Sequence, residues 1–159
     1  MTLQLIFSIL IFYAILIGVN IPAPFIGLEF ESSSKPKLWY APPGFLIPIV
    51  WFVLFTLLGI ARYKLVINGQ AGAQWWLFAL ALLCASYAYY TLGLSKLTHI
   101  SALWFGLWGN IVVILFAVLV VAMLYPINPT AAHLTIPVII WTLYANLIVL
   151  GEMKMQKLV

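Results

Sequence analysis

Five long runs of hydrophobic residues, separated by polar or proline-containing breaks, dominate the sequence. An α-helix needs about 20 mostly apolar residues to cross the roughly 30 Å hydrocarbon layer of a bilayer. The five runs come close to this length or exceed it, and they cover approximately residues 3–20, 43–66, 75–93, 100–125 and 134–151. The pattern therefore predicts an all-α integral membrane protein, a five-transmembrane-helix bundle that forms one membrane domain over residues 1–159.

Prolines indicate where the first two helices end and begin. Pro22 and Pro24 discourage continuation of the first helix, because proline lacks an N–H and restricts the residue before it. Residues 21–42 are expected to form a long loop, which holds two glutamates, three serines and two lysines. Pro43 suits the entrance of the second span, where a missing N–H needs no partner.

Composition excludes a water-soluble globule. Hydrophobic residues make up 66% of the chain and charged residues 6%, against roughly 45–50% and about 25% in soluble domains. The net charge of +4 does not indicate nucleic-acid binding, because the cations are scattered and form no stripe that could follow phosphates. The expected surroundings are the lipid bilayer.

The cations instead predict the orientation of the chain. With five spans, the lysines at 35, 37, 96, 154 and 157 share one side, and Arg62 and Lys64 lie on the other, where they are expected to snorkel toward the headgroups. This five-to-two bias favours a multi-pass protein with a cytoplasmic C-terminus. The first run lacks a basic segment before it, so we expect it to be retained and not cleaved as a secretory signal.

The inventory of reactive side chains is small, and it does not indicate an enzyme. The chain has two histidines, one cysteine, three glutamates and no aspartate, so a nucleophile with an oriented base is not apparent. No acid lies within the five runs, which argues against ion-coupled transport. We predict no metal site. His99 and His133 are interpreted as polar residues at helix entrances, with axial ligation of a haem or chlorin left as the alternative.

Aromatic residues, at 16% of the chain, carry more information. Trp51 and Trp141 lie one and a half to two turns inside their spans, deeper than residues that anchor a helix at the interface. Trp104 and Trp108 are four residues apart and so share a helix face. Flat aromatic walls suit a flat apolar guest, and plain helix packing is the equal alternative.

Two blocks of residues then show a resemblance to a known family. The first is Lys35-Pro36, Trp39-Tyr40, Pro42-Pro43, Val50-Trp51, Gly59 and Tyr63, and the second is Asn128-Pro129-Thr130-Ala131-Ala132-His133 with Pro137 and Trp141. Together they resemble the signature of the TspO/MBR family, the tryptophan-rich sensory and translocator proteins. Length, number of spans and predicted orientation fit the family as well.

The resemblance implies a five-helix bundle, commonly a homodimer, with a pocket beneath the first long loop. Ligands of the family include porphyrins such as protoporphyrin IX, other tetrapyrroles, sterols and synthetic aromatic drugs. Trp51, Trp141 and the small Ala145 match pocket positions, and Trp39 stands for the aromatic residue of the first loop. The ligand-binding site that we predict also includes the neighbouring aromatic residues Tyr90, Trp104, Trp108 and Tyr144.

Several positions depart from the family pattern. The third helix of the family usually carries a glutamine, an asparagine and a tryptophan, where this chain has Ser86, Tyr90 and Gly93. Ile49 replaces the proline before Val-Trp, and Val149 replaces an asparagine late in the fifth helix. A family member with such departures can keep the fold and bind a different ligand, because function resides in the site.

The resulting hypothesis is a membrane protein that binds a hydrophobic planar ligand, a porphyrin or related tetrapyrrole, for sensing, buffering or delivery. No cofactor is expected to be required beyond that ligand. The alternative is a structural subunit that packs its aromatic faces against a larger, pigment-bearing membrane complex. A third reading, light- or oxygen-dependent porphyrin breakdown, has no acid–base constellation to support it.

Overall fold

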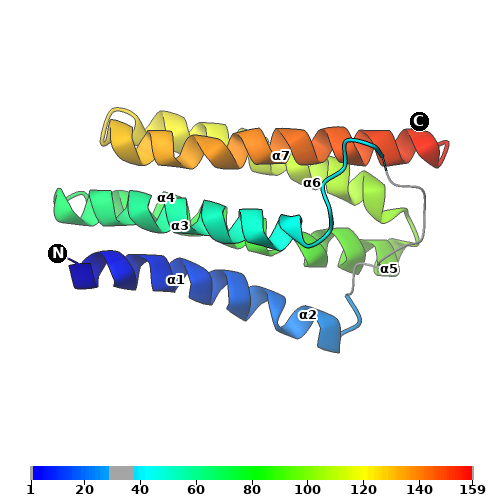
Figure 1. Cartoon of the computed structure of the whole chain (residues 1–159), viewed down its shortest axis with the longest axis horizontal. Coiled ribbons are helices and arrows are strands. Elements are labelled where there is room, and N and C mark those ends of the chain that lie inside the picture. Colours follow the sequence, from blue (N-terminus) through cyan, green and yellow to red (C-terminus); the bar gives the residue numbers. More distant parts are fainter. Residues whose placement is uncertain (1, 29–37, 159) are drawn as a thin grey trace.

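The chain folds into a bundle of long, nearly parallel and antiparallel helices (Figure 1). The computed structural model describes residues 2–28 and 38–158; the sequence features at residues 29–37, including Lys35-Pro36 and Lys37, lie outside them. In the view of Figure 1, the first helix lies lowest, the second and third spans form the middle, and the last two lie on top. The helices are α1 (Thr2–Asn20), α2 (Pro22–Phe25), α3 (Leu46–Ile67), η1 (Ala71–Ala73), α4 (Gln74–Ala85), η2 (Tyr89–Gly93), α5 (Leu94–Thr98), α6 (Ala102–Leu124) and α7 (Pro129–Met155).

Helix length and composition identify the candidate membrane spans. Within the described residues, four helices are long and apolar enough to cross a bilayer, and a bent pair, Ala71–Ala85 with Tyr89–Thr98, makes up to five. The all-helical bundle confirms the predicted fold class, and its apolar helices indicate a multi-pass integral membrane protein. The two ends of the chain lie at opposite ends of the bundle (Figure 1), as an odd number of spans requires.

Helix ends differ from the predicted limits where local chemistry decides them. Helical structure resumes at Pro22 after Ile21 and continues to Phe25, because proline is tolerated in the first turn of a helix. The last helix begins at Pro129, five residues before the predicted start. There the Asn128 side chain accepts a hydrogen bond of 3.1 Å from the backbone N–H of Ala131, which caps the helix.

The third span is broken. α4 ends at Ala85, η2 is a π-helical turn, and the two halves of the span meet at an angle of 49°. Ser86 contributes to the break, because its hydroxyl donates to the carbonyl of Leu82 at 2.7 Å, a contact that bends helices. Helical structure then runs on to Thr98, past the predicted end near Gly93.

The core lies where α1, α3, α4, α6 and α7 meet. Phe12, Phe55 and Leu58 are fully buried there, and the Phe12 ring stacks on Phe78 with centroids 5.3 Å apart. Gly59 permits the closest approach of α1 and α3, since a Cβ at this position would lie 2.7 Å from the Cα of Ile9. Outward-facing positions are also apolar, Leu115 being 65% exposed, as expected of a surface solvated by lipid.

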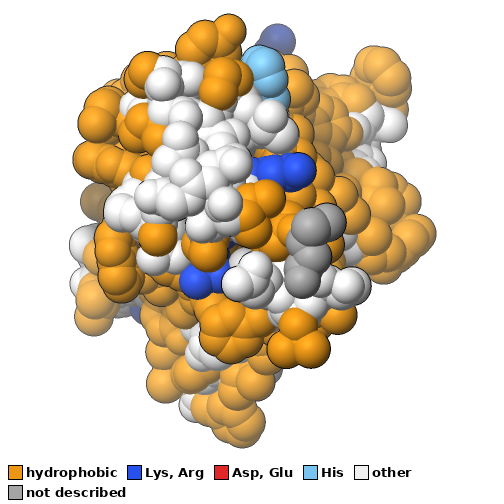
Figure 2. All heavy atoms as spheres, turned by 90° about the vertical axis from the view of Figure 1, so that its left-hand side faces the viewer, with side chains coloured by type: hydrophobic (Ala, Val, Ile, Leu, Met, Phe, Trp, Pro, Cys, Tyr) orange, Lys and Arg blue, Asp and Glu red, His pale blue; other side chains and the backbone are white. Residues whose placement is uncertain are grey.

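Arg62, near the end of α3, joins three helices. Its Nη1 donates to the Ser8 hydroxyl at 2.7 Å and its Nε to the Gln74 side-chain oxygen at 2.8 Å. The guanidinium also lies 5.7 Å from the centre of the Phe78 ring, within cation–π range. Figure 2 looks onto this end of the bundle, where a few basic side chains emerge among hydrophobic ones.

Candidate functional site

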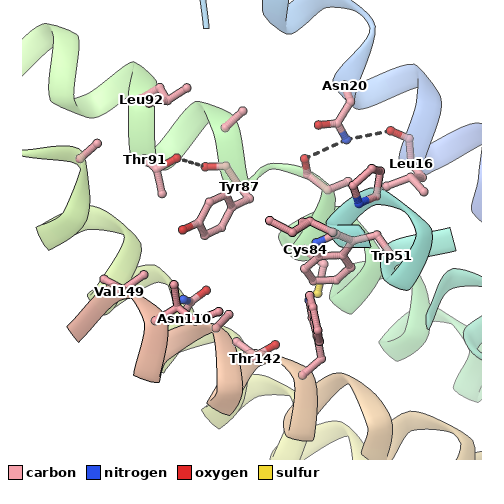
Figure 3. Close-up of a pocket in the computed structure, with 18 of the residues that line it drawn as sticks. Leu16, Asn20, Trp51, Cys84, Tyr87, Thr91, Leu92, Asn110, Thr142 and Val149 are labelled. Atoms are coloured by element: carbon pink, nitrogen blue, oxygen red, sulfur yellow. Dashed lines mark hydrogen bonds between the residues drawn. The ribbon is translucent and has the colours of Figure 1, made fainter. Parts of the chain in front are cut away.

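A cavity of about 790 Å³ lies between the helices and opens onto the surface of the bundle, toward the end that carries the C-terminus. Its wall draws on α1, α3, α4 with the break that follows it, α6 and α7 (Figure 3). The break matters here because it turns Tyr87 and Thr91 onto the wall. Most of the wall is apolar, and the volume falls within the range of about 300–1,000 Å³ that is usual for small-molecule sites.

Two of the predicted tryptophans lie on this wall. Trp51 stands in the second turn of α3 and Trp141 in the middle of α7, and both line the cavity. Phe55 meets Trp51 edge-on at 6.2 Å and 73°, which fixes the orientation of that indole. Ala145 lies one turn beyond Trp141 on the same wall, so its small side chain leaves the space open.

The other predicted site residues lie elsewhere. The cavity wall does not include Trp39, Tyr90, Trp104, Trp108 or Tyr144. Trp39 is 94% exposed and Trp108 is 61% exposed, so both point away from the bundle. Trp104 is partly buried, and Tyr90 packs its ring against Gly109 of α6, which leaves no room for a Cβ there.

Tyr144 does not line the cavity, but it contacts Trp141, which does. Its hydroxyl donates a hydrogen bond of 2.5 Å to the backbone carbonyl of Tyr40, and its ring packs against Trp141 with centroids 5.5 Å apart. Tyr40 and Leu38 in turn fill the space beside Gly151, where a Cβ would collide with both. Residues 38–42, which end the predicted long loop, therefore pack on α7, and Pro42 itself lines the cavity.

Polar groups on the wall were missed by the sequence analysis. Asn20, Asn110 and Glu152 line the cavity together with several hydroxyl groups. Asn110 is 3% exposed, and its side-chain nitrogen has no hydrogen-bond partner. A signal for it was present, since an amide inside an otherwise apolar run is costly in a membrane and tends to mark a functional position.

Neither histidine lies on the cavity wall. His99 follows α5 in a left-handed conformation with φ of 58°, and His133 stands in the first turns of α7, where its ring meets Tyr125 at 5.8 Å. The two positions flank opposite ends of α6. Among residues 2–28 and 38–158, no group of three or more His, Cys, Asp or Glu side chains could hold a metal ion.

Comparison with known proteins identifies a family. The model of the TspO/MBR family matches residues 6–152, which is most of the chain. No curated protein and no solved structure matches the chain.

Proposed function

The chain belongs to the TspO/MBR family, and from this premise we propose that its cavity binds a hydrophobic planar ligand of the porphyrin or tetrapyrrole class. The role of binding is to sense, buffer or deliver the ligand within the membrane. The protein needs no cofactor for this role, because the ligand is its cargo.

One observation carries the proposal: Trp51 and Trp141, from two different helices, line the same cavity of about 790 Å³. Flat aromatic side chains gain energy from offset stacking or edge contacts with a flat guest, in addition to the burial of apolar area. Around them the wall is largely aliphatic, with Ile47, Ala88 and Ile148 among its residues. Such a site offers affinity to a large, flat and mostly apolar molecule.

A titration with protoporphyrin IX tests the proposal. The purified protein in mild detergent is titrated while tryptophan fluorescence is followed, and empty micelles serve as the blank. We expect saturable quenching, because bound porphyrin would lie within a few ångströms of two indoles. Trp51→Phe and Trp141→Phe are each expected to weaken binding and reduce the quenching.

Trp108→Phe is the matched control. It removes an indole that is 61% exposed and does not line the cavity, so affinity should stay unchanged. If both cavity variants bind and quench as the unchanged protein does, the proposed site is ruled out.

We also propose that the C-terminus is cytoplasmic. Lys96 in α5 and Lys154 in α7 lie at one end of the bundle, and Arg62 and Lys64 lie toward the other. Basic residues accumulate on the cytoplasmic side. A reporter that fluoresces only in the cytoplasm, fused after Val159, should be active, and a reporter that needs export should be inactive at the same position.

The oligomeric state separates this function from a structural role. We propose a homodimer, and a subunit of a larger membrane complex is the alternative, which the outward-facing Trp108 would serve as a packing residue. Light scattering in mild detergent should give the mass of two chains. Obligatory co-purification with other subunits would instead support the structural role.

Turnover of the ligand is not part of the proposal. Illumination of the porphyrin-loaded protein should leave the absorbance spectrum unchanged apart from ordinary bleaching. A bilin-like product that depends on Trp51 or Trp141 would overturn this part and indicate porphyrin breakdown.

A further inference from the structure

The exposed part of the cavity wall belongs to two helices. Six of the residues that line the cavity are exposed at the surface, and they lie in the last turn of α1, directly after it, or in the first two turns of α3: Ile17, Asn20, Ile21, Ile47, Pro48 and Phe52. Every other wall residue is buried or partly buried. The cavity therefore opens mainly sideways, between α1 and α3, and we call these six the rim residues.

The contact between α1 and α3 is closed on one side of this lateral opening. The hydroxyl oxygens of Tyr13 and Thr56 lie 2.6 Å apart. Thr56 gives its own proton to the carbonyl of Phe52 at 2.8 Å, so Tyr13 is the donor between the helices. Farther from the cavity, Gly59 lets the two backbones approach closely. Toward the cavity, no hydrogen bond joins α1 to α3 beyond Tyr13 in the part of the chain that the structure describes.

The opposite side of α1 is held in place. Asn20 donates to the carbonyl of Ala85 at 3.3 Å, and the Tyr89 hydroxyl donates to the carbonyl of Val19 at 2.7 Å. These two hydrogen bonds fix the end of α1 against the break in the third span. The helix that borders the opening is thus anchored on its far side, and its side toward α3 is left to apolar contacts.

The lateral opening lies at the depth of the hydrocarbon layer. Ile17 stands eight residues before Phe25, the end of the first candidate span, and Phe52 stands six residues after Leu46, the start of the second. At 1.5 Å per residue these separations are about 12 and 9 Å. None of the six rim residues is charged, and five are apolar. A molecule dissolved in lipid can pass such a rim without exposing polar groups to hydrocarbon, whereas an ion cannot.

We propose that the lateral opening, bordered by Ile17, Ile21 and Phe52, is the route by which the cavity exchanges its ligand with the hydrocarbon layer of the membrane. The ligand is then a molecule dissolved in the bilayer. The bilayer, and not the water beside Glu152 at the end of the bundle, is its source and its destination. This inference rests on the proposed function and adds the route to it.

Narrowing the opening tests the route. Ile17→Phe and Ile21→Phe each add a ring at the rim without adding an indole, so quenching by protoporphyrin IX stays comparable. Association is followed by stopped-flow mixing of protein with the porphyrin in mild detergent, and dissociation by dilution of loaded protein into excess empty micelles. We expect each variant to slow both rates about fivefold or more and to change Kd less than about twofold, because a narrowed passage is crossed in both directions.

Leu10→Phe is the matched control. Leu10 lies on the same helix, is 55% exposed and does not line the cavity, so both rates should stay unchanged. Ala102→Phe probes the rival route, since Ala102 lines the cavity at the start of α6, near the end of the bundle that carries the C-terminus. Slowing by Ala102→Phe without slowing by the two rim variants would place the route at that end and overturn the inference.

The remaining outcomes separate this inference from the function on which it rests. Unchanged rates in both rim variants overturn it. A loss of affinity that appears in dissociation alone also overturns it, because these residues would then hold the bound ligand instead of bordering its passage. In each case the proposed function stands if Trp51 and Trp141 are still required. If wild-type protein does not bind the porphyrin, both fail. Ile21 is 57% exposed, so Ile21→Phe decides even if Ile17→Phe does not fold.

Discussion

The side-chain amide of Asn20, at the end of α1, donates a hydrogen bond of 3.3 Å to the backbone carbonyl of Ala85, the last residue of α4. The carbonyl needs such a donor because the N–H of Tyr89, its usual helical partner, bonds to Ser86 at 3.0 Å. A second hydrogen bond runs in the other direction, because the Tyr89 hydroxyl donates to the carbonyl of Val19 at 2.7 Å. Two hydrogen bonds thus tie the break in the third span to the first helix.

Replacement of Asn20 should therefore loosen the break. We expect Asn20→Leu to lower the free energy of unfolding by about 1–2 kcal/mol, because it leaves a buried carbonyl without a partner. Unfolding in mixed micelles with increasing SDS measures the change. Asn68→Ala is the control, since that amide is exposed and bonds only to the carbonyl of Lys64 in its own helix. Equal losses in the two variants would contradict a special role for Asn20.

Gly59 and Gly18 make a matched pair for the packing of α1 on α3. A Cβ at Gly59 would lie 2.7 Å from the backbone of Ile9, whereas a Cβ at Gly18 would meet nothing within 4 Å. We expect Gly59→Ala to destabilise the bundle by about 1–3 kcal/mol, because backbone must shift to relieve the clash. Gly18→Ala should be neutral or stabilise by up to about 1 kcal/mol through helix propensity. The same SDS titration would show two similar, small effects if the two helices were farther apart at Gly59.

Arg62 should not tolerate lysine, although both are cations. Its guanidinium bonds to Ser8 and to Gln74 from two different nitrogens, and a single ammonium on a flexible stem does not reproduce that fork. We expect Arg62→Lys to cost about 1–2 kcal/mol of unfolding free energy. Lys64→Arg, two residues along the same helix, should change it by less than about 0.5 kcal/mol. A tolerated Arg62→Lys would mean that charge alone matters at this position.

Much of the fold could be predicted because membrane spans are read from length and apolarity. The break in the third span could not, since the sequence from Ala85 to Tyr89 contains no proline or glycine. Its cause lies in tertiary contacts with Asn20 and in the hydroxyl of Ser86, and neither gives a periodic signal. At the end of α1 the sequence does contain a proline, but helical structure continues: Pro22 permits one further helical turn.

The site could be predicted in part, for a physical reason that Trp104 and Trp108 illustrate. Their spacing correctly places two aromatic residues four apart on α6, but it does not reveal whether their face meets lipid or protein. In a soluble helix the apolar face is the buried one, whereas in a bilayer both faces are apolar and the period carries no such information. Trp51 and Trp141 were singled out by their depth in the spans and then by resemblance to the family, and Ala145 by the resemblance alone; these three line the cavity.

Ala145 offers a way to fill the cavity without disturbing the bundle. It lines the same wall as Trp141, one turn away, so a phenylalanine in its place would project into space that the ligand is proposed to occupy. We expect Ala145→Phe to weaken binding of protoporphyrin IX at least about tenfold, which corresponds to about 1.4 kcal/mol. The thermal unfolding midpoint should fall little, because the added ring enters an open volume instead of a packed core, where overpacking costs about 1–3 kcal/mol. Leu147→Phe, on the same helix at a position 59% exposed, should leave affinity unchanged. Undiminished binding by Ala145→Phe, or the same loss in both variants, would place the ligand outside this cavity.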